Sequence, residues 1–325
     1  MGRSLIVLLF TAAGVGGWYV TSHYAIEVHR GQDGRWESVR VASRGVQPGT
    51  PGAGDLPPAG PARSAVRIAS FDLDGLDDNK LANPQVCAAL VRVIPRFDIV
   101  AVQGIRSKNR SVLVRLIEQI NATGRSYDFA TCPTLDRDPV ETYNALLFDL
   151  TSVEIDRSTV HSVEDSARRF RVKPLLASFR VRGPPESEAF TFTLVNVMVD
   201  PRRTPQELDL LADVFRAARD SQRNEDDIIM LGDFDADPDH LGRLAQVPNL
   251  AAAINATPTT TRGTRLSDNI LFDRRATIEY TGRSAVMDLI RELDLTPQAA
   301  LEVSEHLPVW AEFSSYEGGQ SGHVP

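Results

Sequence analysis

The stretch DIIMLGDFDAD, residues 227–237, joins four apolar residues to three aspartates at alternate positions. The apolar run predicts a short buried strand, and the aspartates that follow place negative charge at the end of that strand. Because side chains two residues apart in a strand point to the same side, we expect Asp233 and Asp235 to point in the same direction. The stretch therefore predicts a sheet edge that carries acidic groups.

On both sides of this stretch, strand-like and helix-like segments alternate. Residues 173–182 and 189–200 show the period-two, β-branched pattern of paired strands across a GPPESE turn. Residues 111–124 are amphipathic and predict a helix. A further helix is expected from an N-cap at Thr204, with Glu207 completing a capping box. Many strands with a few long helices favour an α/β fold in which two sheets pack face to face with helices outside.

The N-terminus carries a targeting signal. Residues 5–20, LIVLLFTAAGVGGWYV, have no charge and follow Arg3. As a helix they span roughly 24 Å, a little less than the ~30 Å hydrocarbon core of a bilayer, and Trp18 and Tyr19 suit its interface. We therefore expect residues 1–22 to anchor the protein in a membrane, with a cleaved signal peptide and export as the alternative.

The rest of the chain divides by composition. Residues 23–44 predict one or two short membrane-proximal strands with a GQDG turn. Residues 45–64 are rich in Pro, Gly and Ala, and they cannot bury enough apolar surface to offset the entropy of ordering, so we expect a flexible linker. A single folded domain is then expected over residues 65–315, followed by a flexible tail at 316–325.

The overall charge argues against strong, sequence-independent binding of nucleic acid. The 325 residues have a formal net charge of −8. Proteins that bind nucleic acid independently of its sequence usually carry clustered Lys and Arg. The acidic net charge of this chain gives no sign of such binding. It does not exclude a nuclease, which can hold phosphates through a metal ion.

Acidic groups recur at the predicted strand ends. Each lies at the polar end of an apolar segment. Besides Asp233 and Asp235, the acidic residues are Asp72, Asp268 and Glu305, and His306 is the neighbour of Glu305. Each one alone is typical of a solvated turn. Gathered at one sheet edge, they would repel one another unless a cation or a proton lay among them. The ordered series therefore predicts a common site.

This ordered series resembles the endonuclease/exonuclease/phosphatase superfamily, and most closely its deoxyribonuclease I-like branch. The resemblance rests on segments spread over residues 65–313: VRIASFDLDGL, FDIVAVQGIRS, ETYNALLF, FTLVNVMVDP, DIIMLGDFDAD, LSDNILFD and ALEVSEHLPVWAEF. It implies a four-layered α/β sandwich of two packed mixed β-sheets flanked by helices. It also implies descent from a Mg²⁺-dependent phosphodiesterase in which two histidines flank the scissile phosphate.

Position by position, the resemblance implies a site that is only partly kept. The residues that match catalytic positions are His306, Asp233, Asp268 and Glu141, and Arg106 matches a substrate-binding position.

Other positions depart from the family pattern. The glutamate that is a principal metal ligand falls on Gly104, and one of the two flanking histidines falls on Met198. Asp72 and Asp235 stand where asparagine is usual, and Glu305 stands where aspartate is usual. Gly104 offers no ligand and Met198 cannot transfer a proton, so the ordinary mechanism of the family is compromised.

Two functions from different classes stay open at this point. The altered carboxylates predict a displaced Mg²⁺ site, with Mn²⁺ or Ca²⁺ as alternatives, made from Asp72, Asp235, Asp268 and Glu305. Asp235 is also a candidate substrate contact. The first function is that of a membrane-associated pseudoenzyme that acts as a binding or scaffold module. The alternative is an active metal-dependent phosphodiesterase with rebuilt ligands, acting on nucleic acid or on a lipid headgroup.

Overall fold

The structure is a computed structural model that describes residues 24–30, 36–43, 64–107, 110–132, 142–220 and 225–319. The predicted anchor and residues 45–63 of the predicted linker lie outside these ranges. Within the described ranges, no helix is both long enough and apolar enough to cross a bilayer.

The chain divides into two units, and the first contains a small hairpin. Its strands β1 (Tyr24–Arg30) and β2 (Trp36–Ser43) pair antiparallel, with a register shift near the Arg30 end. The sequence predicted one or two short strands here, and the structure has two.

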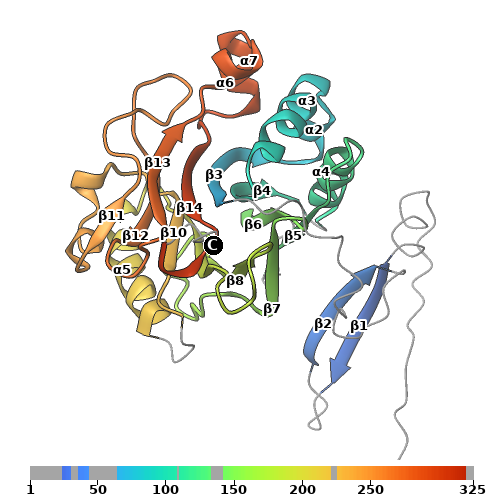
Figure 1. The fold of residues 1–325 in the computed structure, drawn as a ribbon. Coiled ribbons are helices and arrows are strands. Elements are labelled where there is room, and N and C mark those ends of the chain that lie inside the picture. The colour runs from blue at the N-terminus through green and yellow to red at the C-terminus, as the bar shows by residue number, and fades with distance from the viewer. Residues whose placement is uncertain are drawn as a thin grey trace, which may run out of the picture. The chain divides into compact units, whose positions relative to one another are not determined.

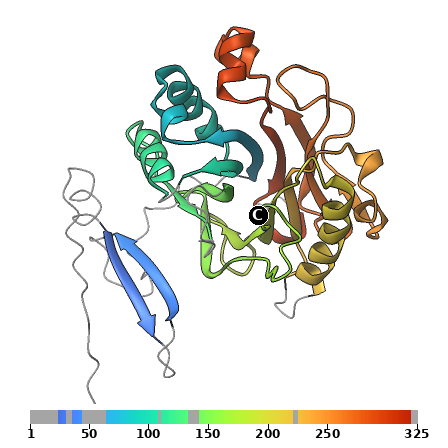
Figure 2. The ribbon, with the colours of Figure 1, turned by 180° about the vertical axis from the view of Figure 1, so that it is seen from behind.

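Two six-stranded sheets form the second unit, as Figures 1 and 2 show from opposite sides. The strand order of the first sheet is β13 (Tyr280–Val286), β14 (Val309–Ser314), β3 (Ala65–Leu76), β4 (Ile99–Arg106), β6 (Thr142–Asp149), β5 (Tyr127–Ala130). The order of the second is β11 (Leu250–Ala252), β12 (Asp268–Asp273), β10 (Ile228–Asp233), β9 (Thr191–Met198), β8 (Leu175–Val181), β7 (Val153–Ser162). Each sheet is mixed, because β3 and β4, like β9 and β10, run parallel, whereas the other neighbours run antiparallel.

Helices cover the outer faces of both sheets. The first sheet shares an apolar cluster with α3 (Pro84–Val93), α4 (Ser111–Asn121), α6 (Leu289–Leu293) and α7 (Pro297–Val303), and the short α2 (Asp78–Ala82) adds Leu81 to it. The second sheet packs in the same way against α5 (Thr204–Asp220). A third apolar cluster lies between the sheets, so the predicted four-layered sandwich is confirmed.

Aromatic residues fill the space between the two sheets. Phe190 and Phe192 stack with ring centroids 4.8 Å apart, and Phe190 also lies 6.0 Å from Phe313 of the opposite sheet. Phe272 contacts the same Phe313 edge-on at 5.8 Å. This rigid apolar centre fixes the strands whose ends carry the polar groups.

Two details of the fold differ from the sequence predictions. The expected capping box is wrong: α5 begins at Thr204, and the two oxygens of buried Glu207 accept hydrogen bonds from the backbone N–H groups of Arg171 and Asp200 instead. The ordered domain also continues past the expected end at residue 315, because Tyr316 forms a β-bridge with Ala189.

Candidate active site

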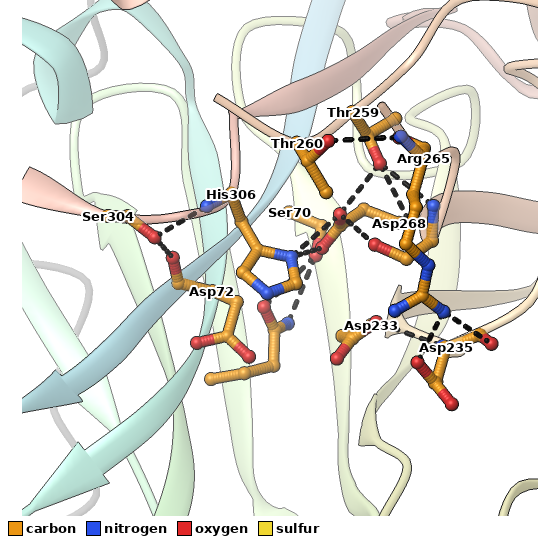
Figure 3. A network of polar contacts seen from close by, with 12 residues as sticks. Ser70, Asp72, Asp233, Asp235, Thr259, Thr260, Arg265, Asp268, Ser304 and His306 are labelled. Carbon is orange, nitrogen blue, oxygen red and sulfur yellow. Dashed lines mark hydrogen bonds and ion pairs between the residues drawn. The ribbon is translucent and has the colours of Figure 1, made fainter. Parts of the chain in front are cut away.

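Four strands bring their polar ends to one edge of the sandwich (Figure 3). Asp72 lies in β3 opposite Gln103 of β4, and Asp233 is the last residue of β10. Asp268 is the first residue of β12 and pairs directly with Asp233. His306 lies just before β14 and is bridged to Thr260. The convergence of Asp72, Asp233, Asp268 and His306 follows from the strand order.

Three of these side chains form a group able to hold a metal ion. One ligand atom each from Asp72, Asp233 and His306 lies within 4.8 Å of the other two. Burial raises the pKa of Asp72 and raises that of Asp233 well above its usual value, and the charge of Asp268 raises both further, whereas the charge of His306 lowers them. A positive charge placed here would therefore be stabilised.

The side chains of Asp268 and His306 are paired with each other. The Nδ1 atom of His306 lies 2.9 Å and 3.1 Å from the two carboxylate oxygens of Asp268. The hydroxyls of Thr259 and Ser267 donate to the same Oδ2 at 2.8 Å and 2.9 Å. Burial opposes protonation of His306, but the hydrogen bond and charge of Asp268, with Asp72 and Asp233, raise its pKa to about 10. Asp268 therefore favours the protonated form of this imidazole, which is a proton donor.

Gly104 and Asp72 fit together sterically. Gly104 has φ +69°, a left-handed conformation that favours glycine. A Cβ atom at this position would lie 2.6 Å from Oδ1 of Asp72 and 3.2 Å from the backbone N atoms of Asp74 and Gly75. The Asp72 carboxylate, held by a 2.7 Å hydrogen bond from the N–H of Asp74, therefore occupies the space that any side chain at 104 would enter.

Met198 lies at the position where the resemblance implies a histidine. It ends β9 and is the parallel-register neighbour of Asp233. Its thioether can neither accept nor donate a proton at neutral pH. The site thus contains one imidazole, that of His306, within the described part of the chain.

The expected shared direction of Asp233 and Asp235 is wrong. The strand β10 ends at Asp233, and Asp235 has φ +50°, so the alternation of a strand no longer applies. Its carboxylate accepts from the hydroxyl of Thr204 at 2.5 Å. It also pairs with Arg265 at 2.6 Å (Figure 3).

The remaining predicted residues lie outside the close group. Glu305 is exposed and faces Arg262 at 3.6 Å, so it is not among the gathered ligands. Arg106 is exposed at the end of β4. Glu141 lies outside the described residues, and its predicted role stays a prediction.

The sequence reasoning missed a buried amide bridge behind the site. The Nε2 atom of Gln103 donates to Oδ1 of Asn196 at 2.7 Å, which joins β4 of one sheet to β9 of the other. Asn196 donates in turn to the carbonyls of Val102 at 3.1 Å and Ala145 at 2.9 Å. The signal for this bridge was a single amide inside each of two apolar strands.

Ser304 and Lys80 were also missed. The hydroxyl of Ser304 donates to the carbonyl of Asp72 at 2.7 Å and accepts from the N–H of His306 at 2.9 Å, so it sets the spacing between the two residues. Lys80 donates to the carbonyls of Leu73 and Asp74, and burial lowers its pKa against the charges of Asp74 and Asp72.

A basic cavity lies near this edge. Its volume is about 130 Å³, and it is bordered by Tyr143 and Asn144 of β6 and by the basic side chains of Arg168, Arg171 and Lys173. The start of β6 pairs with the end of β4 at Arg106, so the cavity is on the side of the sheet edge that carries the site. Positive charge here complements the acidic group.

Comparisons with known proteins agree with the fold. No protein-family model matches the chain. In sequence it is 26% identical over 269 residues to deoxyribonuclease-1-like 2 of Mus musculus, covering 78% of this chain and 93% of that protein. It is 29% identical over 263 residues to deoxyribonuclease-1-like 1 of Homo sapiens, covering 76% and 84%.

Solved structures show the same fold. D. rerio TDP2 complexed with a single-strand DNA product gives a TM-score of 0.55 at 14% identity, over 78% of this chain and 100% of that one. The human Nocturnin catalytic domain with bound sulfate gives 0.51 at 14% identity, over 79% and 96%. In sequence the chain is therefore similar to deoxyribonuclease I-like proteins, and it shares its fold with TDP2 and the Nocturnin catalytic domain.

Proposed function

We propose that this domain binds a phosphodiester together with a divalent cation and hydrolyses it poorly, as a pseudoenzyme that serves as a binding or scaffold module. The observation that carries the proposal is which groups in the site can donate a proton and which can accept one. His306 is held protonated by Asp268, and Met198 stands where a second imidazole is implied. The site keeps a proton donor and has no imidazole, among its described residues, to take a proton from water.

The residues present fit a divalent cation. Asp72 and Asp233 are buried carboxylates with raised pKa values, and their oxygens lie close together with an atom of His306. Mg²⁺ is commonly bound by one or two carboxylates with waters, so Asp72 and Asp233 would hold it. When bound, such an ion neutralises and polarises a phosphate. His306 would donate a hydrogen bond or a proton to a phosphate oxygen, oriented by Asp268.

A nucleic acid strand is the phosphodiester that we favour. The relatives in sequence are named deoxyribonucleases, and the TDP2 structure holds a single-strand DNA product. The basic cavity formed by Arg168, Arg171 and Lys173 would hold flanking phosphates. A lipid headgroup is the alternative ligand.

One observation favours a second candidate, an active phosphodiesterase. The Asp72 carboxylate fills the space next to Gly104, so a carboxylate is still present beside the position of the missing glutamate. On this interpretation the ligand set is rebuilt, with Asp72 replacing the lost side chain.

Hydrolysis and binding separate the two candidates. We would measure cleavage of plasmid DNA and of bis-p-nitrophenyl phosphate with Mg²⁺, Mn²⁺ or Ca²⁺, with an Asp233→Ala/His306→Ala variant as control. Under the proposal, DNA binds in a cation-dependent way and the turnover is no higher than that of the control. Turnover that the control abolishes would overturn the proposal and establish the second candidate.

We also propose that residues 1–22 tether the domain to a membrane, on the basis of their uncharged apolar run. Membrane fractionation of the full chain, compared with a chain that begins at residue 23, tests this. The full chain is expected in the membrane pellet after a carbonate wash. Release of the full chain into the supernatant would contradict a stable anchor.

A further inference from the structure

A second acidic cluster lies at the opposite end of β10. Asp227 directly precedes this strand, whereas Asp233 ends it, so about six residues at roughly 3.3 Å each, or ~20 Å, separate the two aspartates. The cluster also contains Glu279, just before β13, and Glu317, in the turn after β14. One carboxylate oxygen each from Asp227, Glu279 and Glu317 lies within 4.8 Å of the others.

Buried carboxylate oxygens in this cluster lack a hydrogen-bond donor. Asp227 and Glu279 are each 2% exposed. Within the described ranges, Oδ1 of Asp227 and Oε2 of Glu279 have no hydrogen-bond donor. Buried polar atoms are nearly always paired, so these unpartnered oxygens point to a missing positive ligand.

Within the described part of the chain, no basic side chain forms an ion pair with the cluster. Among the described residues, no recorded ion pair involves Glu225, Asp227, Glu279 or Glu317. Burial, followed by the charge of Glu279, raises the pKa of Asp227 to about 8. Burial also raises the pKa values of Glu225 and Glu279.

Backbone N–H groups hold one carboxylate oxygen of each glutamate. The N–H of Gly318 donates to Oε1 of Glu279 at 2.6 Å, and that of Thr191 donates to Oε2 of Glu317 at 3.1 Å. The N–H of Asp227 donates to Oε1 of Glu225 at 2.9 Å. Glu317 is exposed, so an ion can enter from solvent on its side of the cluster.

We propose that Asp227, Glu279 and Glu317, with Glu225, form a second divalent-cation site whose preferred ion is Ca²⁺. All the donors are hard oxygens, which disfavours metals that prefer thiolate or imidazole. Ca²⁺ accepts six to eight oxygens in flexible geometry, whereas Mg²⁺ demands a near-ideal octahedron. The ion would join the start of β10 to β13 and to the turn after β14, so its role is to stabilise the fold. This inference does not depend on the proposed function.

The test uses the full chain in an Asp72→Asn/Asp233→Asn background, which removes the carboxylates of the first site. Calorimetric titration with Ca²⁺ is expected to show one bound ion. At a free Ca²⁺ concentration one hundred times the Kd, the Tm is expected to rise by about 5–10 °C. Adding Asp227→Asn and Glu279→Gln should abolish both effects.

Two further variants keep the test decisive if the buried substitutions prevent folding. Glu317→Gln changes an exposed ligand and should weaken Ca²⁺ binding at least tenfold, whereas Glu188→Gln removes a neighbouring exposed charge outside the cluster and should not. Absence of Ca²⁺ binding in the background protein, or equal binding by the Glu317→Gln and Glu188→Gln variants, would overturn the proposal. The cluster would then be a set of carboxyl groups that share protons.

Discussion

At the scale of single residues, Gly104 combines a left-handed backbone with close contact to the Asp72 carboxylate of the site. Gly104→Ala is expected to lower the free energy of unfolding by about 1–3 kcal/mol, because alanine is strained at φ +69° and its Cβ would meet the Asp72 carboxylate. Urea denaturation measures this loss. A Gly104→Ala protein as stable as the wild type would show that the left-handed backbone is not required.

Gly104→Ala can be combined with Asp72→Ala to separate the backbone strain at residue 104 from the steric contact with the Asp72 carboxylate. The double variant should lose less stability than the sum of the single variants, since it removes the 2.6 Å contact and keeps only the backbone strain. Strict additivity would mean that Asp72 and Gly104 do not interact.

His306 gives a prediction on pH. Its folded pKa of about 10 lies above the unfolded value of 6.5, so the stability that it contributes is complete below pH 6.5 and is lost as the pH rises through about 10. Asp268→Asn should lower this pKa by removing the main stabilising partner of the imidazolium, and should flatten the stability profile between these limits.

Histidine NMR titration of both proteins measures this effect directly. His240, an exposed histidine paired with Asp237, serves as the internal control and should titrate alike in both. A His306 midpoint that does not move in the Asp268→Asn protein would contradict the assignment.

Met198 gives a gain-of-function prediction. If the missing proton acceptor limits hydrolysis, Met198→His should raise the rate on bis-p-nitrophenyl phosphate in the presence of Mg²⁺ by about 10²-fold or more. Met198→Gln is the matched control, since glutamine is polar and similar in size but transfers no proton. Equal rates for the two variants would mean that a proton acceptor at 198 is not what limits the site.

At the scale of elements, the bridge between β4 and β9 should stabilise the packed sheets. Asn196→Leu removes the amide donor to the carbonyls of Val102 and Ala145 and the shortest of the contacts of the Gln103 amide, so a loss on the order of 2–4 kcal/mol is expected. Because Gln103→Leu removes one side of the same bridge, the Gln103→Leu/Asn196→Leu double variant should cost less than the sum of the singles. Chemical denaturation of the four proteins tests this cycle.

The element scale also shows where sequence patterns stop being informative. Apolar runs predicted β10 and its neighbours, because buried strands require them. The direction of Asp235 was mispredicted because β10 ends two residues earlier and the backbone turns. The amide bridge could not be predicted, since a lone Gln103 or Asn196 in an apolar strand reveals no partner across 93 residues.

At the scale of the whole molecule, the sandwich predicts a gradient of local stability. Strands β3, β4, β9 and β10 lie inside their sheets, whereas β5, β7, β11 and β13 are edge strands. Amide hydrogens in the inner strands should exchange only through global unfolding, and those of the edge strands should exchange faster. Hydrogen exchange measured by mass spectrometry tests this, and uniform protection across each sheet would contradict it.

The fold class was predictable at this scale and the central group of residues was predictable in part, but the second cluster was not. The order of strands and helices, with the resemblance that it carries, predicted the four layers and the meeting of Asp72, Asp233, Asp268 and His306. Asp227, Glu279 and Glu317 are separated by 52 and 38 residues in the chain and carry no common motif. Only the pairing of strands brings them together.

The fit between Gly104 and Asp72 limits which substitutions either position can accept. A glutamate placed at 104 would enter the space of the Asp72 carboxylate and would have to adopt a left-handed backbone. A substitution of Asp72 by a smaller residue would open that space and would also remove a carboxylate from the site. The two positions are therefore coupled, and the effect of a substitution at one depends on the residue at the other.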